Sequence, residues 1–335
     1  MAIDPELGLN VGLNVMAYAG EVDPMARAVW AEAQGYESVW MTDGGGRMDA
    51  FTAAAAIGAQ TERIRIGLSI VPVFTRPPAV FGTSCATLSH VAPDRLAIGL
   101  GSSSQTMIES WYGIPFEKPL TRVRETVTAL RQILTGERTT FEGDTITVKN
   151  FRLAIPTRGN VPLFLAALRP KMLEAAGELA DGVILNLAPP QLLPRMLEHI
   201  DTGAKRSGRR VDDLEIASLL NVVVTRDESA ALGALNRFAL GYYSTGVYNK
   251  FLAWMGYEKE AQQIQQGFAE RDRAKTEGAL PEEVIRTLGI IGDADSCRSQ
   301  LKAYAEAGLN TAIIGPGATT EEDYEATLGA FAKVA

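Results

Sequence analysis

The chain has 335 residues, of which 46% are hydrophobic and 21% are charged, a composition typical of a globular enzyme. Its formal net charge of -8 argues against nucleic acid as a partner, because an acidic protein repels phosphate backbones. No uncharged apolar stretch approaches the roughly 20 residues of a membrane span, and the acidic residues 1–6 do not resemble a secretory signal. We therefore expect a cytoplasmic protein with a small-molecule substrate.

The two cysteines, Cys85 and Cys297, lie far apart in the sequence. Their spacing fits neither a disulfide framework nor a metal site, so we expect two buried thiols in a reducing compartment. With only two histidines in the chain, we also expect no bound metal.

Short runs rich in β-branched residues alternate with longer amphipathic runs. Asp23-Pro24 opens the first helix, because proline suits the first helical position. The third strand is apolar at nearly every residue, as expected for a parallel strand covered on both faces. In chain order, the first half is predicted to hold a strand at 9–15, a helix from 24, a strand at 38–42, a helix at 50–59, a strand at 64–71, a helix at 77–90, a strand at 95–100 and a helix at 119–134.

The second half begins with Glu142-Gly143-Asp144 between two alternating runs, which predicts a hairpin insertion at 139–153, after the fourth helix. The elements predicted after it are a strand at 162–167, a helix from 170, a strand at 182–186, a helix at 190–206, a strand at 214–224, a helical segment at about 227–283, a helix at 295–307 and a strand at 311–314.

The segment at about 227–283 is helical in period and has no strand signal, so we interpret it as a helical insertion between the seventh and eighth strands. It is rich in aromatic residues, which form either a lid over a pocket, an ordinary helix core or a dimer surface. These residues are Phe238, Tyr242, Tyr243, Tyr248, Phe251, Trp254 and Tyr257.

Eight strand–helix units with right-handed crossovers close most naturally into a (β/α)8 TIM barrel, an α/β fold that would occupy residues 1–335 as a single domain. The rival architecture is a doubly wound open sheet, which would place a glycine-rich phosphate loop after its first strand. Residues 14–18 contain no such loop.

Functional residues of a barrel gather at the carboxyl ends of its strands. The second strand ends at Asp43, an acid followed by three glycines that would let the backbone approach a ligand, or else a flexible loop with a solvated carboxylate. The fourth strand ends at Gly101 and Ser102, which lack the third glycine of a dinucleotide fingerprint. After the fifth strand, a helix start with basic residues suits an anion, although solvated basic side chains would look the same. This last segment is Ala166, Ala167, Leu168, Arg169, Pro170 and Lys171.

Taken together, several segments resemble the luciferase-like superfamily of flavin- and F420-dependent oxidoreductases, and most of all its coenzyme F420-dependent branch. The resemblance covers nearly the whole chain and depends on the order and spacing of residues 42–43, 67–79, 94–102, 141–144, 166–171 and 176–182.

The resemblance implies a flavin or deazaflavin cofactor at the barrel mouth, and a dimer or tetramer. It implies a non-prolyl cis peptide between Ser69 and Ile70, behind the central ring of the cofactor. It also places the ring edge at 101–102, the cofactor's backbone and phosphate near 166–171, and an acid for hydride transfer at Glu109. Gly44 stands where sugar-phosphate relatives have a histidine, so we do not expect their chemistry.

We therefore predict an oxidoreductase that transfers a hydride between coenzyme F420 and an organic substrate, with Asp43 or Glu109 as the proton donor. One alternative is an FMN-dependent luciferase-like monooxygenase on the same barrel. Another is a non-catalytic flavin-binding barrel protein. A metal-dependent barrel hydrolase is disfavoured, because the first strand carries no His-x-His pair.

Overall fold

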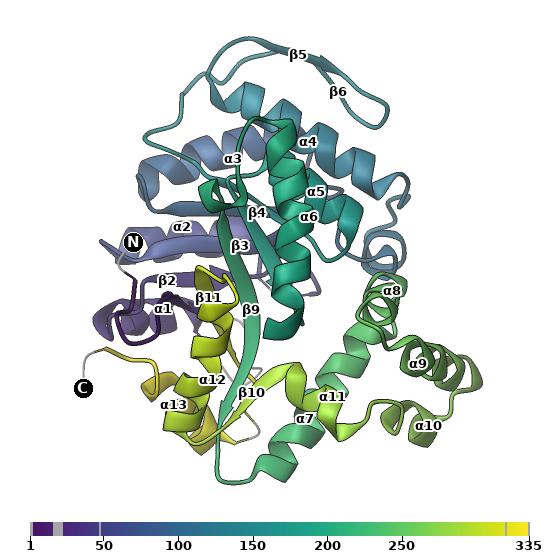
Figure 1. The fold of residues 1–335 in the computed structure, drawn as a ribbon. Coiled ribbons are helices and arrows are strands. Elements are labelled where there is room, and N and C mark those ends of the chain that lie inside the picture. Colours follow the sequence, from purple (N-terminus) through teal and green to yellow (C-terminus); the bar gives the residue numbers. More distant parts are fainter. Residues whose placement is uncertain (1–2, 16–22, 47, 319, 334–335) are drawn as a thin grey trace.

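The computed structural model describes residues 3–15, 23–46, 48–318 and 320–333. Eight parallel strands follow one another around a closed ring, and the pairing of the sixth with the seventh completes it, so the predicted (β/α)8 barrel is confirmed (Figure 1). Every predicted strand lies within two residues of the observed one. The strands are β1 (Asn10–Asn14), β2 (Ser38–Met41), β3 (Arg65–Pro72), β4 (Leu96–Gly101), β7 (Leu163–Ala166), β8 (Gly182–Asn186), β9 (Glu215–Val224) and β11 (Thr311–Pro316).

Helices cover the outside of the barrel (Figure 1). The first begins as predicted, since Asp23 accepts hydrogen bonds from the amides of Met25 and Ala26, and Pro24 occupies the first turn. Proline also stands in the first turn of the third, fourth and fifth covering helices. The covering helices are α1 (Pro24–Ala33), α2 (Ala50–Gln60), α3 (Pro78–Val91), α4 (Pro119–Leu134), α5 (Pro170–Leu179), α6 (Leu193–Arg206), α12 (Ala294–Glu306) and α13 (Glu321–Gly329).

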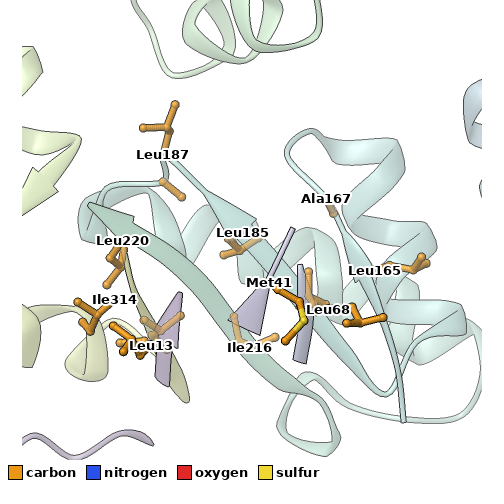
Figure 2. Close-up of a cluster of buried hydrophobic side chains, with 14 of the residues drawn as sticks. Leu13, Met41, Leu68, Leu165, Ala167, Leu185, Leu187, Ile216, Leu220 and Ile314 are labelled. Carbon is orange, nitrogen blue, oxygen red and sulfur yellow. The ribbon is translucent and has the colours of Figure 1, made fainter. Parts of the chain in front are cut away.

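Alternation along each strand sorts the apolar side chains into two layers. The outward layer packs beneath the helices and includes Leu13, Met41, Leu68, Leu165, Leu185 and Ile314 (Figure 2). The inward layer is a separate cluster inside the barrel, made of Trp40, Ala97, Phe164, Ile184, Ala217 and Ile313. Gly67 leaves room for the Trp40 ring, because a Cβ there would lie 2.1 Å from it.

An ion pair closes the barrel at the amino ends of the strands. The Arg65 guanidinium Nη1 lies 2.9 and 2.7 Å from the two carboxylate oxygens of Glu215, and the Thr311 hydroxyl donates to Glu215 at 2.7 Å. The guanidinium also lies 5.1 Å from the Phe164 ring centroid. Both charged side chains are largely buried, at 12% and 17% exposure, so the loss of either one would remove a neutralising charge from a site with little water.

The predicted insertion is helical throughout, as α7 (Glu228–Tyr243), α8 (Gly246–Trp254), α9 (Glu258–Glu270), α10 (Arg273–Glu277) and α11 (Glu282–Thr287). It is followed by a strand that the sequence analysis missed, β10 (Gly289–Gly292), which pairs in parallel with residues 221–224 of β9. The pairing of β8 with β9 ends at Leu219. Thus β10 takes the place of β8 beside β9 at the barrel mouth.

The hairpin insertion is confirmed as the antiparallel strands β5 (Thr139–Glu142) and β6 (Thr147–Phe151). Its turn is bonded to α4, because the Glu125 carboxylate accepts hydrogen bonds from the backbone amides of Asp144 and Thr145. Both cysteines are buried and unpaired, and burial raises the pKa of each thiol to about 12. In the described part of the chain, no helix is long and apolar enough to span a membrane.

Two glycines set the close approach of α5 and α6. A Cβ on Gly203 would lie 1.9 Å from the Glu174 carbonyl oxygen, and one on Gly177 would lie 1.9 Å from the Ile200 carbonyl oxygen. We expect Gly203→Ala to lower the free energy of unfolding by about 1–3 kcal/mol, because two helix backbones must separate to admit the methyl group.

Urea unfolding of both proteins measures this change. The matched control is Gly241→Ala in α7, where a Cβ would meet nothing within 4 Å. There the substitution should leave stability unchanged or raise it by up to about 1 kcal/mol. Equal effects at the two glycines would contradict the steric account.

Candidate active site

The third strand is irregular where it reaches the barrel mouth. The peptide bond between Ser69 and Ile70 is cis, as predicted, and the register of β3 against β4 shifts between Leu68 and Val71. The Ile70 side chain turns toward β4, where Cβ atoms added at Gly99 and Gly101 would each lie 3.1 Å from it. Glycines on β4 therefore make room for Ile70 on the inner wall of the mouth.

Ala166 at the end of β7 completes this wall. A Cβ at Gly101 would lie 3.2 Å from the Ala166 Cβ as well as 3.1 Å from Ile70. Three predicted cofactor contacts, Ile70, Gly101 and Ala166, thus meet in one apolar surface. Ser102, the first residue after β4, is partly buried. The Ser69 hydroxyl oxygen, next to Ile70 in the chain, is buried and finds no hydrogen-bond partner in the part of the chain that the structure describes.

The end of β2 is hydrogen-bonded to this irregular segment. The Thr42 hydroxyl donates to the Ser69 carbonyl oxygen at 2.9 Å, and the Asp43 amide donates to the Ile70 carbonyl oxygen at 3.2 Å. The Asp43 side chain is 8% exposed. Its Oδ1 accepts from the Ala50 amide at 2.9 Å and its Oδ2 accepts from Arg76 at 2.7 Å. Both carboxylate oxygens are therefore occupied.

Arg76, which the sequence analysis did not single out, bridges two carboxylates. It pairs with Asp43 on one side and with Asp49, the N-cap of α2, on the other. Burial lowers the pKa of Arg76, but the hydrogen bonds and negative charges of Asp43 and Asp49 outweigh burial and raise it. The guanidinium stays charged, and its charge is balanced within this group.

Three glycines follow Asp43, and all have positive φ angles, of 94°, 68° and 73°. A Cβ at Gly44 would lie 2.8 Å from the Tyr112 hydroxyl, to which the Gly45 amide donates at 3.3 Å. A histidine at position 44 would need both a strained backbone and displacement of Tyr112. The backbone conformation and the contact with Tyr112 therefore both favour glycine at position 44.

Tyr112 follows a π-helix, Thr106–Trp111, that the sequence analysis did not predict and that carries Glu109. The Glu109 carboxylate is exposed and accepts from the Gln105 amide at 2.9 Å and from the Phe116 backbone amide at 3.2 Å. π-helices occur often at functional sites. Unlike Asp43, Glu109 accepts from neutral donors alone within residues 3–15, 23–46, 48–318 and 320–333.

At the end of β7, α5 begins at Pro170 with Arg169 as its N-cap residue. The exposed side chains of Arg169 and Lys171 form no ion pair within the described residues, while Ala167 is buried and Leu168 packs partly against the core. A helix start with two unpaired cations favours a phosphate or carboxylate. This basic edge lies one strand away from the apolar surface on β3 and β4.

Two polar residues on the far side of the mouth, Asn186 and Asn221, were missed by the sequence analysis. Asn186 ends β8 on the inward face that Ile184 occupies, and Asn221 lies on the inward face of β9, two residues beyond Leu219. The Asn186 Nδ2 donates to the Tyr248 hydroxyl of α8 at 2.9 Å. The Asn186 Oδ1 and the Asn221 Nδ2 are buried and have no hydrogen-bond partner among the described residues.

Tyr248 helps to decide whether the aromatic residues of the insertion form a lid, a helix core or a dimer surface. Tyr248 reaches β8, and its ring lies 4.7 Å from that of Tyr242, while burial and the neighbouring Tyr242 raise its pKa. Tyr243 and Phe251 are fully buried instead. The insertion therefore supplies both helix core and one polar contact to the barrel mouth.

Within the described residues, no cluster of three or more His, Cys, Asp or Glu side chains could hold a metal ion.

Comparisons with known proteins identify the family of this chain. The family model of the luciferase-like monooxygenases matches residues 18–311. The 5,10-methylenetetrahydromethanopterin reductase of Methanolobus tindarius is 28% identical over 85% of this chain and 87% of its own. The F420-dependent glucose-6-phosphate dehydrogenase of Tsukamurella paurometabola is 30% identical over 87% of each chain.

Among solved structures, an F420-dependent secondary alcohol dehydrogenase in complex with an F420–acetone adduct has a TM-score of 0.80 at 21% identity, over 98% of each chain. This similarity shows the barrel fold, and the family model covers most of the sequence. The chain therefore belongs to the luciferase-like monooxygenase family.

Proposed function

We propose that this protein transfers a hydride between coenzyme F420 and an organic substrate at the barrel mouth. The observation that carries the proposal is the apolar surface of Ile70, Gly101 and Ala166. A Cβ added at Gly101 would occupy the space between Ile70 and Ala166. A flat ring fits such a surface. The F420-dependent glucose-6-phosphate dehydrogenases at 29–30% identity support this cofactor.

The chain's own residues would divide the binding of this cofactor between two places. Ile70, Gly101 and Ala166 would contact the ring, and the basic edge at Arg169 and Lys171 would hold the anionic tail. When bound, F420 supplies a carbon centre that carries two electrons as hydride. The protein's contribution is to position the ring and the substrate, and to move a proton.

Between the two candidate acids, the geometry favours Glu109 as the proton donor. A proton on either oxygen of Asp43 would break a hydrogen bond to Arg76 or to the Ala50 amide. A proton on Glu109 would also displace one donor, Gln105 or the Phe116 amide, but in the described structure both donors are neutral and the side chain is exposed, so the cost is smaller than at Asp43. Asp43 would instead hold the β2 end and the β3 segment in the geometry that binds the cofactor.

We expect Asp43→Asn to weaken F420 binding about tenfold, since it replaces a charge-assisted hydrogen bond to Arg76 with a neutral one. Quenching of F420 fluorescence on titration with protein measures the dissociation constant. The matched control is Asp49→Asn, which alters the other carboxylate of Arg76 but is more exposed, at 46%, and keeps a good N-cap residue. It should change the constant less than threefold, and an equal loss in both variants would contradict a special role for Asp43.

A second candidate is an FMN-dependent monooxygenase, because the matching family model describes monooxygenases. Titration of the apoprotein with F420 and with FMN, each followed by cofactor fluorescence, separates the two. We expect F420 to bind more tightly than FMN by at least about tenfold. Tight FMN binding without F420 binding would overturn the proposal. If neither reduced cofactor transferred a hydride on the protein, the result would indicate a non-catalytic flavin-binding protein.

A further inference from the structure

The two sides of the barrel mouth differ in character. Around the closed ring, β9 lies four strands from β3 in either direction, so the two strands face each other across the barrel. The β3 side presents the apolar surface of Ile70. The β8–β9 side presents Asn186 and Asn221, with Tyr248 reaching over from the insertion.

The strand register places the two asparagines near each other. The residue paired with Asn221 on the neighbouring β11 is Gly315, which adds no side chain beside it. Asn186 pairs with Leu219, two residues before Asn221 on the same strand. With strands about 5 Å apart and about 3.3 Å per residue, the two amides are diagonal neighbours on one inward face.

The unsatisfied atoms of this group are its main evidence. Buried polar side-chain atoms are nearly always hydrogen-bonded, and leaving one unpaired is costly. Here the Asn186 Oδ1 and the Asn221 Nδ2 lack partners within the described structure. Reversing the Asn186 amide would satisfy Tyr248 from the oxygen instead, but one end of the amide would still be unpaired.

We propose that Asn186, Asn221 and Tyr248 form a neutral hydrogen-bonding site that holds the carbonyl or hydroxyl group of the substrate, opposite the apolar surface on β3. The proposal rests on the proposed function and names the substrate class of the same site. The group offers both donors and an acceptor, which a carbonyl–alcohol pair uses in its two oxidation states.

The charges at the mouth favour an uncharged substrate. The inward residues at the ends of β8, β9 and β11 are Asn186, Asn221 and Gly315, none of which carries charge. Arg76 is balanced by Asp43 and Asp49, and the unpaired cations Arg169 and Lys171 lie at the start of α5. A phosphate or carboxylate placed beside the asparagines would lose hydration without meeting a cation among these described residues.

The test uses three ketones of increasing size, butanone, cyclohexanone and acetophenone, and the matched carboxylates butanoate, cyclohexanecarboxylate and benzoate. Saturation-transfer NMR titrations against the F420-loaded protein give a dissociation constant for each probe. We expect at least one ketone to bind and its matched carboxylate to bind at least tenfold more weakly. Tighter binding of the carboxylates, or no ketone binding to the loaded protein, would overturn the proposal.

Two variants locate the bound ketone. Asn221→Leu and Tyr248→Phe should each weaken ketone binding about fivefold to tenfold, with F420 affinity and circular dichroism unchanged. The control, Tyr257→Phe, removes a hydroxyl from the same insertion and should change ketone binding less than twofold. Unchanged ketone binding in both test variants would contradict the site.

Failure of the proposed function has a different signature. If F420 does not bind, hydride transfer from it is excluded, whereas the same titrations on the unloaded protein still measure the site. Ketone binding there that is weakened by Asn221→Leu and by Tyr248→Phe would support the site alone. Its absence in both the loaded and unloaded protein would refute it.

Discussion

Glu215→Ala is expected to lower the free energy of unfolding by about 3–5 kcal/mol, because it removes the carboxylate that pairs with the buried Arg65 guanidinium. Arg65 is 12% exposed and lies inside the ring of strands, against the Phe164 and Trp40 rings. The Thr311 hydroxyl loses its acceptor in the same step. Chemical denaturation followed by circular dichroism measures the loss.

A double variant separates the charge from the packing. Arg65→Met combined with Glu215→Leu replaces both ions with apolar side chains and should recover most of the stability lost in Glu215→Ala. If the double variant is as unstable as the single one, the loss comes from packing volume rather than from an unpaired charge. A decrease in unfolding free energy below about 1 kcal/mol in Glu215→Ala is the range of an exposed ion pair. It would contradict the buried ion pair described at the amino ends of the strands.

Glu109→Gln is expected to lower the rate of hydride transfer with F420 by about 10²–10⁴-fold, the range that a general acid contributes. Gln105 and the Phe116 amide donate to different oxygens of Glu109, so glutamine keeps one of these two hydrogen bonds, and it has no acidic proton to give. The affinity for F420 should change less than twofold. Stopped-flow absorbance of the cofactor gives the rate, with reductant or substrate in excess.

The neighbouring exposed residue Glu117 supplies the control for Glu109. Glu117→Gln removes the same charge from the same loop and should leave the rate within about twofold, as expected for a solvated surface carboxylate. A large loss in both variants would indicate a general electrostatic effect. Full activity of Glu109→Gln would move the proton donor to another group.

The barrel could be predicted from sequence because its signals are local. Buried parallel strands such as residues 64–71 are apolar at almost every position, and prolines such as Pro24 and Pro170 mark helix starts. The missed strand β10 is only Gly-Ile-Ile-Gly. It forms because β8 leaves the side of β9 before residue 221, a tertiary event that no local pattern records.

The site was predicted in part, and the omissions have a common cause. Asp43 is visible as an acid at a strand end, but its partner Arg76 lies 33 residues away and joins it only when β2 and β3 pair. Asn186 and Asn221 stand at inward positions near strand ends, so counting alternate residues from Ile184 and Ala217 would have found them. Tyr248 joins them through the insertion, whose path across the barrel has no sequence signal.

The most direct test of the central claim is the identity of the cofactor that accompanies the protein. Purification from a host that makes both F420 and FMN, followed by mass spectrometry of the released small molecules, identifies it. We expect coenzyme F420 in near-stoichiometric amount, and its loss on replacing Gly101 with leucine, which would fill the space between Ile70 and Ala166. Copurification of FMN without F420, or no effect of the Gly101 substitution on the bound cofactor, would contradict the account.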